Sequence, residues 1–177
     1  YICFLDESGI SDKPSVRKTW APKGHTPVIS SAGGWKIRSV TGAIVCTPTG
    51  KNPRLYLRIT NGNIRHPEFI RFLKHLRSHV RRKIILVTDR LPAHLAGNAQ
   101  RFIKQQRSWL TVKWFPSYAP ELNPVEYLWS ASKQKDYANY CPDTMTELDG
   151  RIRTSTKRVR RKPRVLKGFL KASGLFH

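Results

Sequence analysis

Short apolar runs separated by polar segments divide the chain into predicted strands and helices. Residues 1–5, 37–46, 54–60 and 84–88 are rich in β-branched and other apolar side chains, which is typical of strands. The first and last of these runs are apolar without alternation, as in strands covered on both faces. A further strand is predicted at residues 111–115. The first strand is expected to end after residue 5, where acidic residues begin.

Helical spacing of apolar residues predicts helices between the later strands. The first helix is expected to begin at His66, which can cap it, with Pro67 in its first turn. Residues 93–107 are a second predicted helix, and a third begins near Asn123. The buried face of the first helix is expected to consist of Phe69, Phe72, Leu73, Leu76 and Val80.

The segment at residues 11–34 is rich in Pro, Gly and Lys, which predicts a loop or short strand with Trp20 as its anchor. Because the first three strands are close in sequence, they are expected to form antiparallel hairpins, whereas helices separate the later strands. The sequence therefore predicts an α/β domain with a mixed sheet.

The C-terminal segment differs in composition from the rest. Residues 151–171 contain ten basic residues and no acid, which predicts one or two basic helices with a break at Pro163. We expect residues 1–142 to form the α/β domain, and residues 143–177 to form a basic helical extension packed on or beside it. The basic surface is either a solvated face or one that meets nucleic acid, and the lack of acids favours the second.

The overall charge indicates a polyanionic partner. Lys and Arg total 33 against 11 Asp and Glu, a net charge of +22. Such an excess repels itself in a compact fold, and a phosphate backbone relieves it. A membrane partner is disfavoured because no apolar run approaches the length of a spanning helix. Composition alone does not separate DNA from RNA.

The three cysteines, Cys3, Cys46 and Cys141, are widely spaced, and the first two lie in apolar runs. They are expected to be buried small hydrophobes of a reducing compartment, which favours a cytoplasmic protein. The chain opens at Tyr1 without Met, directly into a strand. We therefore expect a fragment that has lost an N-terminal region.

Two carboxylates are placed where α/β proteins build their sites. Asp6 and Asp89 directly follow the two most apolar strands. If those strands are parallel neighbours, both side chains emerge at one edge of the sheet. Adjacent carboxylates repel each other unless a cation lies between them, and oxygen ligands suit Mg²⁺ or Mn²⁺. Either Asp alone is better explained as a turn former at a strand end, but the two together with a third acid are not.

A third acid is not decided by chemistry alone. Glu121 and Glu126 are both suitable, and Glu126 has a structural alternative. It lies three residues after Asn123, which is close to a capping box at a helix N-terminus.

Three sequence phrases resemble those of DDE transposases, most closely the bacterial insertion-sequence branch of the mariner-like superfamily. Residues 118–129 (YAPELNPVEYLW) resemble the signature around the last catalytic acid. Residues 89–94 (DRLPAH) resemble the segment with the second acid, and residues 6–9 (DESG) resemble the first. The 36 residues between Asp89 and Glu126 are near the family's usual gap.

The resemblance implies a ribonuclease H-like fold with a five-stranded mixed sheet flanked by helices. It implies Asp6, Asp89 and Glu126 as catalytic residues and metal ligands. They would hold two Mg²⁺ or Mn²⁺ ions, whose binding is expected to depend on DNA. The activity implied is DNA strand cleavage and strand transfer, at transposon ends and at a TA target, by a homodimer in the bacterial cytoplasm at the nucleoid.

The sequence departs from the family pattern at two points. Arg90 stands where many relatives have Asn, a mild change that leaves the metal ligands intact. The family's N-terminal helix-turn-helix region does not occur in this sequence, so this chain alone is not expected to recognise transposon ends. The alternatives are a catalytically inactive DNA-binding remnant and a ribonuclease H-like nuclease.

Several other residues are candidates for the DNA surface. His94 could lie near the metals or contact phosphate, or it could be satisfied by local hydrogen bonds. Trp114 and Trp129 are expected in the core, whereas Phe115 and Tyr118 could stack on bases or belong to the core. The expected DNA contacts are His94, Arg90, Lys133, Arg158, Arg160 and Arg161.

Overall fold

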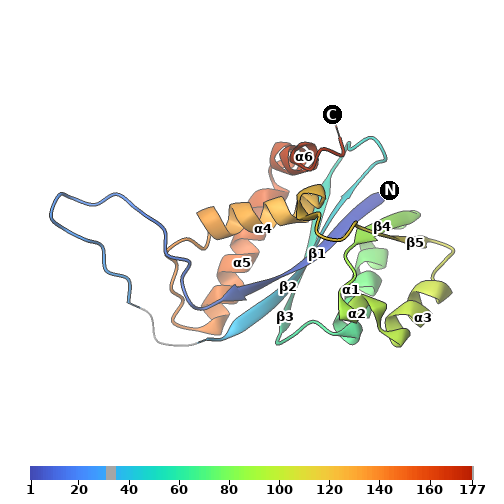
Figure 1. The fold of residues 1–177 in the computed structure, drawn as a ribbon, viewed down its shortest axis with the longest axis horizontal. Coiled ribbons are helices and arrows are strands. Elements are labelled where there is room, and N and C mark those ends of the chain that lie inside the picture. The colour runs from blue at the N-terminus through green and yellow to red at the C-terminus, as the bar shows by residue number, and fades with distance from the viewer. Residues whose placement is uncertain (31–34, 177) are drawn as a thin grey trace.

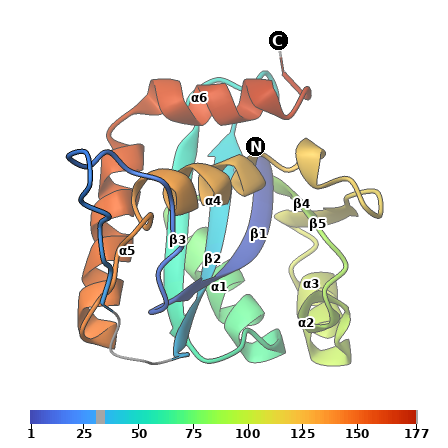
Figure 2. The ribbon, with the colours of Figure 1, turned by 60° about the vertical axis from the view of Figure 1, so that its left-hand side comes forward.

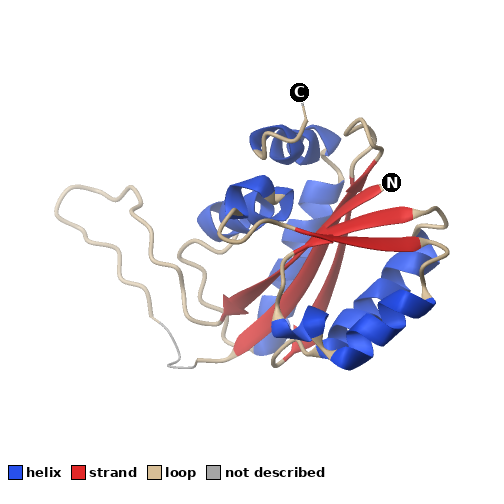
Figure 3. Ribbon diagram, turned by 45° about the vertical axis from the view of Figure 1, so that its right-hand side comes forward, coloured by secondary structure: helices blue, strands red, loops and turns tan. Residues whose placement is uncertain are grey.

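The computed structural model describes residues 1–30 and 35–176, and its centre is a five-stranded mixed sheet with helices on both faces (Figure 3). The strand order is β3-β2-β1-β4-β5. β1, β2 and β3 pair antiparallel, whereas β4 and β5 run parallel to β1. This confirms the predicted α/β class. The strands are β1 (Ile2–Ser11), β2 (Ile37–Cys46), β3 (Arg54–Asn61), β4 (Ile84–Thr88) and β5 (Leu110–Trp114).

The first strand is longer than its apolar run. β1 continues through Asp6 to Ser11, so the prediction that it ends after residue 5 was wrong. Residues 6–11 pair with the first half of β2, from Gly42 back to Ile37. Backbone pairing with a neighbouring strand overrides the weak strand preference of the sequence DESG. Asp6 therefore lies in the middle of a strand.

One face of the sheet is covered by α1 (His66–His79), α2 (Pro92–Leu95) and α3 (Gly97–Gln105) (Figure 1). The predicted apolar face of α1 is confirmed: its residues Phe69, Phe72, Leu73 and Leu76, and Val80 after it, are all buried.

Two details of these helices differ from the predictions. His66 is the first helical residue and not the cap. The cap is Arg65, whose backbone N–H donates to the Glu68 carboxylate at 3.1 Å. The helix predicted at residues 93–107 is two helices, because Ala96 has an extended backbone with ψ 139. Gly97 follows it, and Gly has the weakest helix propensity after Pro.

The other face is covered by the C-terminal half of the chain. Figure 2 shows α4 lying across β1 and β2, with α5 beside β3 and α6 above them. Their apolar residues join those of the sheet in one core. The predicted division into an α/β domain up to residue 142 and a C-terminal extension stays a prediction. No helix of the described segments is long and apolar enough to cross a membrane. These elements are the 3₁₀ helix η1 (Pro120–Leu122), α4 (Pro124–Lys135), α5 (Met145–Arg160) and α6 (Pro163–Ala172).

Residues 12–30, which follow β1, project away from the sheet (Figure 1). The base of this segment is tied to the end of α4, where the Arg17 N–H donates to Asn139 Oδ1 at 2.7 Å. Trp20 is 99% exposed, so the prediction that it anchors this segment in the core was wrong. The part of the predicted loop at residues 31–34 lies outside the described residues. A stretch so rich in Pro, Gly and Lys offers too few apolar neighbours to bury one indole.

Candidate active site

Asp6 is held on the face of the sheet that α4 covers. The Trp129 indole Nε1 donates a hydrogen bond to Asp6 Oδ2 at 2.9 Å, and Asp6 is 7% exposed. Its partner across the strand pair is Gly42 in β2. A Cβ at Gly42 would lie 2.8 Å from two atoms of the Trp129 ring. The missing side chain at Gly42 therefore makes room for the indole that holds Asp6.

Asp89 follows β4 directly and lies beside Asp6. β1 and β4 pair in parallel from Ile2 with Ile85 to Phe4 with Val87. Continuing this register by two residues brings Asp6 level with Asp89. The Asp89 side chain is 42% exposed, so it is accessible at the rim.

Glu126 reaches the same rim from the first turn of α4. Asn123 caps this helix, with its Oδ1 accepting the Val125 N–H at 3.1 Å, and Pro124 occupies the first turn. The Asn123 side chain therefore caps the helix without help from Glu126, whose side chain is exposed. This leaves the Glu126 carboxylate available for another role.

The electrostatics of Asp6 indicate that the charges of the other two acids act on it. The pKa of Asp6 is raised to about 8, first by burial and then by the charges of Glu126, Glu7 and Asp89, although the Trp129 hydrogen bond lowers it. Glu121, the other candidate for the third acid, lies in η1 and is not among the charges that shift this pKa. The geometry therefore favours Glu126.

A second network holds Asp89 from the opposite face of the sheet. The His94 imidazole is fully buried, and its ring packs 4.2 Å from that of Phe69 between centroids. Its Nε2 lies 3.1 Å from Glu7 Oε1, and its Nδ1 lies 3.1 Å from Asp89 Oδ1. Glu7 and Asp89 are thus joined through one imidazole.

The charge of this histidine follows from its neighbours. Burial alone would lower the pKa of His94, but the hydrogen bonds to Asp89 and Glu7 and the Glu7 charge raise it to about 10. Ligand atoms of Glu7, Asp89 and His94 all lie within 4.8 Å of one another, a spacing that could also suit a metal ion. A protonated imidazole explains the geometry better, because both ring nitrogens already face carboxylate oxygens and a bound ion could use only one of them.

Sequence reasoning missed Glu7 and left His94 open between a place near the metals, a phosphate contact and local hydrogen bonds. Adjacent residues of a strand point to opposite faces, so Asp6 and Glu7 address α4 and α2 respectively. That alternation is visible in the sequence DESG and could have identified Glu7 as a partner for another element. His94 has no exposed surface, so in this conformation it acts on Asp89 and not on DNA.

The predicted basic contacts do not form one surface. Arg90 is exposed beside Asp89, and Lys133 is exposed near the end of α4. Arg158 is instead engaged in an ion pair with Asp136 at 2.7 Å, which ties α5 to the end of α4. Arg160 lies at the β3 edge, where its Nε donates to a backbone carbonyl, and Arg161 is exposed at the end of α5.

The aromatic residues near the rim separate into two groups. Trp129 is buried as predicted, and Phe115 stacks on Phe4 with ring centroids 6.2 Å apart, whereas Trp114 is only partly buried. Tyr118 is fully exposed in the loop that leads from β5 to α4, with a φ of 57°. Only Tyr118 has a ring face free to meet a base.

Comparisons with known proteins bear on the fold and on the family. A protein of Shigella sonnei named "Insertion element IS630 uncharacterized 39 kDa protein" is 26% identical over 155 residues, which are 86% of this chain and 43% of that protein. The catalytic domain of Mos1 mariner transposase has the same fold, with a TM-score of 0.58 at 13% identity over 99% of this chain and 83% of that one.

The structure of Mos1 transposase in a paired-end complex with the left transposon end gives a TM-score of 0.64 at 14% identity. It covers 99% of this chain and 56% of that one, so the chain spans about half the length of such relatives. The profile of the DDE superfamily endonucleases matches residues 1–147. The predicted resemblance is therefore confirmed, and the chain belongs to the DDE superfamily of endonucleases.

Proposed function

We propose that this chain is the catalytic core of a DNA transposase, in which Asp6, Asp89 and Glu126 perform metal-dependent cleavage and joining of DNA phosphodiesters. What supports the proposal is the parallel register that brings Asp6 level with Asp89, together with the charge of Glu126, which raises the pKa of Asp6. Membership of an endonuclease superfamily supports the same reaction class.

The residues at the rim fit divalent cations. A carboxylate that is buried beside other acids, as Asp6 is, is stabilised in its charged form by a nearby cation. Asp6 Oδ1 accepts no hydrogen bond from the described residues. Together with the accessible Asp89 and the exposed Glu126, it offers the hard, oxygen-only set that Mg²⁺ or Mn²⁺ prefers.

The three acids then share one task, which is to hold the metal ions. Asp6, Asp89 and Glu126 would together hold two ions. Bound divalent ions would polarise the scissile phosphodiester and lower the pKa of the attacking water. Paired-end complexes of Mos1 have been solved with Mn and with Mg, which supports this choice of ion.

Two neighbours orient the ligands. The Trp129 N–H fixes one oxygen of Asp6, and protonated His94 fixes one oxygen of Asp89. Each contact leaves the second oxygen of its carboxylate free for an ion. Such surrounding hydrogen bonds tune both the orientation and the affinity of a metal site.

The substrates and assembly belong to the same proposal. The net charge of +22 and the similarity to transposase complexes with transposon ends support DNA as the partner. A TA target, a homodimer and work in the bacterial cytoplasm at the nucleoid extend the proposal by analogy with the family. Accessible Arg90 and Lys133 would contact the backbone of the DNA that is cut.

Nicking of duplex DNA in Mn²⁺ tests the proposal. Asp89→Asn and Glu126→Gln should each lower the nicking rate by about a thousandfold or more, since loss of roughly 4 kcal/mol of transition-state stabilisation has that effect. Glu121→Gln is the matched control and should stay within about threefold of the native rate, because a change under about 1 kcal/mol is expected away from the ions.

The alternatives give different results in the same assay. Duplex binding without any cleavage in Mn²⁺ would indicate a catalytically inactive remnant. Preferential cutting of RNA in an RNA–DNA hybrid would indicate a ribonuclease H-like nuclease. Equal losses in Glu121→Gln and Glu126→Gln would remove Glu126 from the site.

A further inference from the structure

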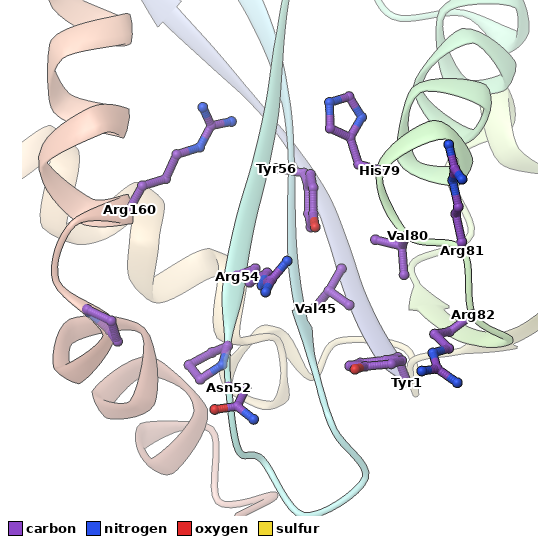
Figure 4. A pocket seen from close by; sticks show the side chains of 12 residues that line it. Tyr1, Val45, Asn52, Arg54, Tyr56, His79, Val80, Arg81, Arg82 and Arg160 are labelled. Carbon is purple, nitrogen blue, oxygen red and sulfur yellow. The ribbon is translucent and has the colours of Figure 1, made fainter.

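A basic hollow lies on the molecule away from the three acids. It has a volume of about 550 Å³ and is bounded by the end of α1, by β3 and by the end of α5. Figure 4 shows Arg160 entering from α5 on one side and His79 to Arg82 on the other, with Arg54 and Tyr56 of β3 between them. None of Asp6, Asp89 and Glu126 lines it.

The lining of this hollow is positive without compensation. Four arginines and no acid line it. An adjacent hollow of about 350 Å³ shares Arg160, adds two further arginines and again has no acid. Together the two hollows follow the β3 edge of the sheet, and we call their arginines the arginine edge: Arg54, Arg58, Arg81, Arg82, Arg153 and Arg160.

Most of these guanidinium groups have no partner within the protein. Among the described residues, only Arg160 of the six makes a side-chain hydrogen bond, from Nε to the Leu55 carbonyl at 2.9 Å, and none makes an ion pair. The resulting positive field reaches α1: burial and His79, and then Arg58 and Arg160, lower the pKa of His75. Uncompensated charge of one sign is relieved by a polyanion.

The geometry of the edge suits a duplex backbone. Arg54 and Arg58 are four residues apart on one face of β3, roughly 13 Å along an extended strand. That distance is close to the width of the DNA major groove, about 12 Å, across which two phosphate backbones face each other. A second copy of this chain is a poorer occupant because it would present the same positive charge, and charged side chains on an edge strand oppose strand pairing.

We propose that the arginine edge binds the sugar–phosphate backbone of a duplex DNA segment other than the one at the catalytic rim. The proposal rests on the proposed function only in taking DNA as the partner. Arginine contacts to phosphates position a duplex without reading its sequence, so this surface binds DNA of any sequence. It gives the protein a second hold on DNA that does not depend on metal ions.

Binding of a fluorescent duplex without metal, in EDTA, tests this surface by anisotropy across a range of salt. Arg81→Gln with Arg82→Gln should weaken binding by about tenfold or more at 0.15 M salt and reduce the slope of log K against log salt by about 1.8, or 0.9 for each lost phosphate contact. Arg81→Lys with Arg82→Lys keeps the charge and should restore most of the affinity.

The matched control is Arg101→Gln with Lys104→Gln, which removes the same charge from exposed positions of α3 outside both hollows. It should change the slope by less than about 0.5, because no phosphate contact is lost. Equal weakening by control and test variants would show that only net charge matters and would overturn the proposal, as would an unchanged slope in the test variant. If the arginine substitutions weaken the binding of single-stranded RNA and not that of duplex DNA, the surface binds RNA and the proposal is overturned.

The nicking assay distinguishes failure of this proposal from failure of the proposed function. If Arg81→Gln with Arg82→Gln weakens DNA binding while the native protein fails to nick DNA in Mn²⁺, the arginine edge is supported and the proposed transposase activity is rejected. If Asp89→Asn abolishes nicking and the arginine variants bind DNA normally, the proposed activity is supported and the arginine edge is rejected as a DNA-binding surface.

Discussion

The catalytic rim, formed by Asp6, Asp89 and Glu126, concentrates negative charge, and the arginine edge concentrates positive charge on the same sheet. The protein supports the two regions in different ways. At the rim, Asp6 is buried and accepts a hydrogen bond from Trp129, whereas Asp89 is paired with His94, whose Nδ1 lies 3.1 Å from Asp89 Oδ1 and 3.0 Å from the Asp89 carbonyl oxygen. At the edge, the arginines are spread over β3, α5 and the turn after α1, with little support from the rest of the protein.

This difference indicates which property each region depends on. A buried charge is sensitive to small changes in its partners, since an unmatched group loses solvation that nothing replaces. An exposed charge is solvated in any of several conformations, so its effect depends on charge more than on exact position. The rim should therefore respond to substitutions that preserve shape, whereas the edge should respond only to substitutions that remove charge.

The largest expected effect comes from a substitution that preserves shape at the rim. Glu7→Gln removes the charge that favours protonated His94 and thereby loosens the contact to Asp89. The Mn²⁺ concentration for half-maximal nicking should rise about 10- to 100-fold, as is typical when a group behind a metal ligand is lost. DNA affinity in EDTA should stay unchanged, which separates this role from the arginine edge. Unchanged dependence on Mn²⁺ would show that Glu7 and His94 only support the fold.

Next in size is the effect of filling the space beside Asp6. Gly42→Ala introduces a Cβ that meets the Trp129 ring at 2.8 Å. Such overpacking should lower the free energy of unfolding by about 1–3 kcal/mol and reduce nicking through displaced Trp129.

Gly150→Ala in the middle of α5 is the control for this substitution, because a Cβ there meets nothing within 4 Å. It should stabilise the protein by about 0.5–1 kcal/mol, since Ala is the better helix former. Urea unfolding measures both values. Similar stability of the two variants would mean that the indole adjusts freely and does not fix Asp6.

A smaller effect is expected from pH in the absence of metal. The folded pKa values of Asp6 and His94, about 8 and about 10, lie above the ordinary values of 3.8 and 6.5. Both groups therefore add stability that is fully present below the ordinary pKa and is lost as pH rises through the folded pKa.

In EDTA, Tm should fall on the order of 5 °C between pH 6 and pH 8, and the fall should be shallower in Asp6→Asn. Mn²⁺ should restore Tm at the higher pH by binding the charged carboxylates. Thermal unfolding measures these changes, and a Tm that rises with pH in EDTA would contradict the assigned electrostatics. The arginine edge keeps its charge over this range, so its DNA binding should not follow the same curve.

The sequence by itself determined the elements and most of their order. Four of the five strands were predicted within one residue, and the apolar face of α1 was identified in full, because strand and helix periodicity is local and burial acts on it directly. The motif around residues 118–129 supplied the prediction that Glu126 is the third acid. Periodicity could not do so, because Glu121 and Glu126 are chemically alike.

Only the tertiary structure decided which side chains meet. β1 extends past Asp6 because β2 pairs with it, and Glu7 reaches His94 because the strand alternates between two faces. Trp20 is apolar yet exposed, since burial depends on neighbours that its own segment does not supply. Contacts of this kind depend on the register between strands and on the packing of helices, and both are set by residues far away along the chain.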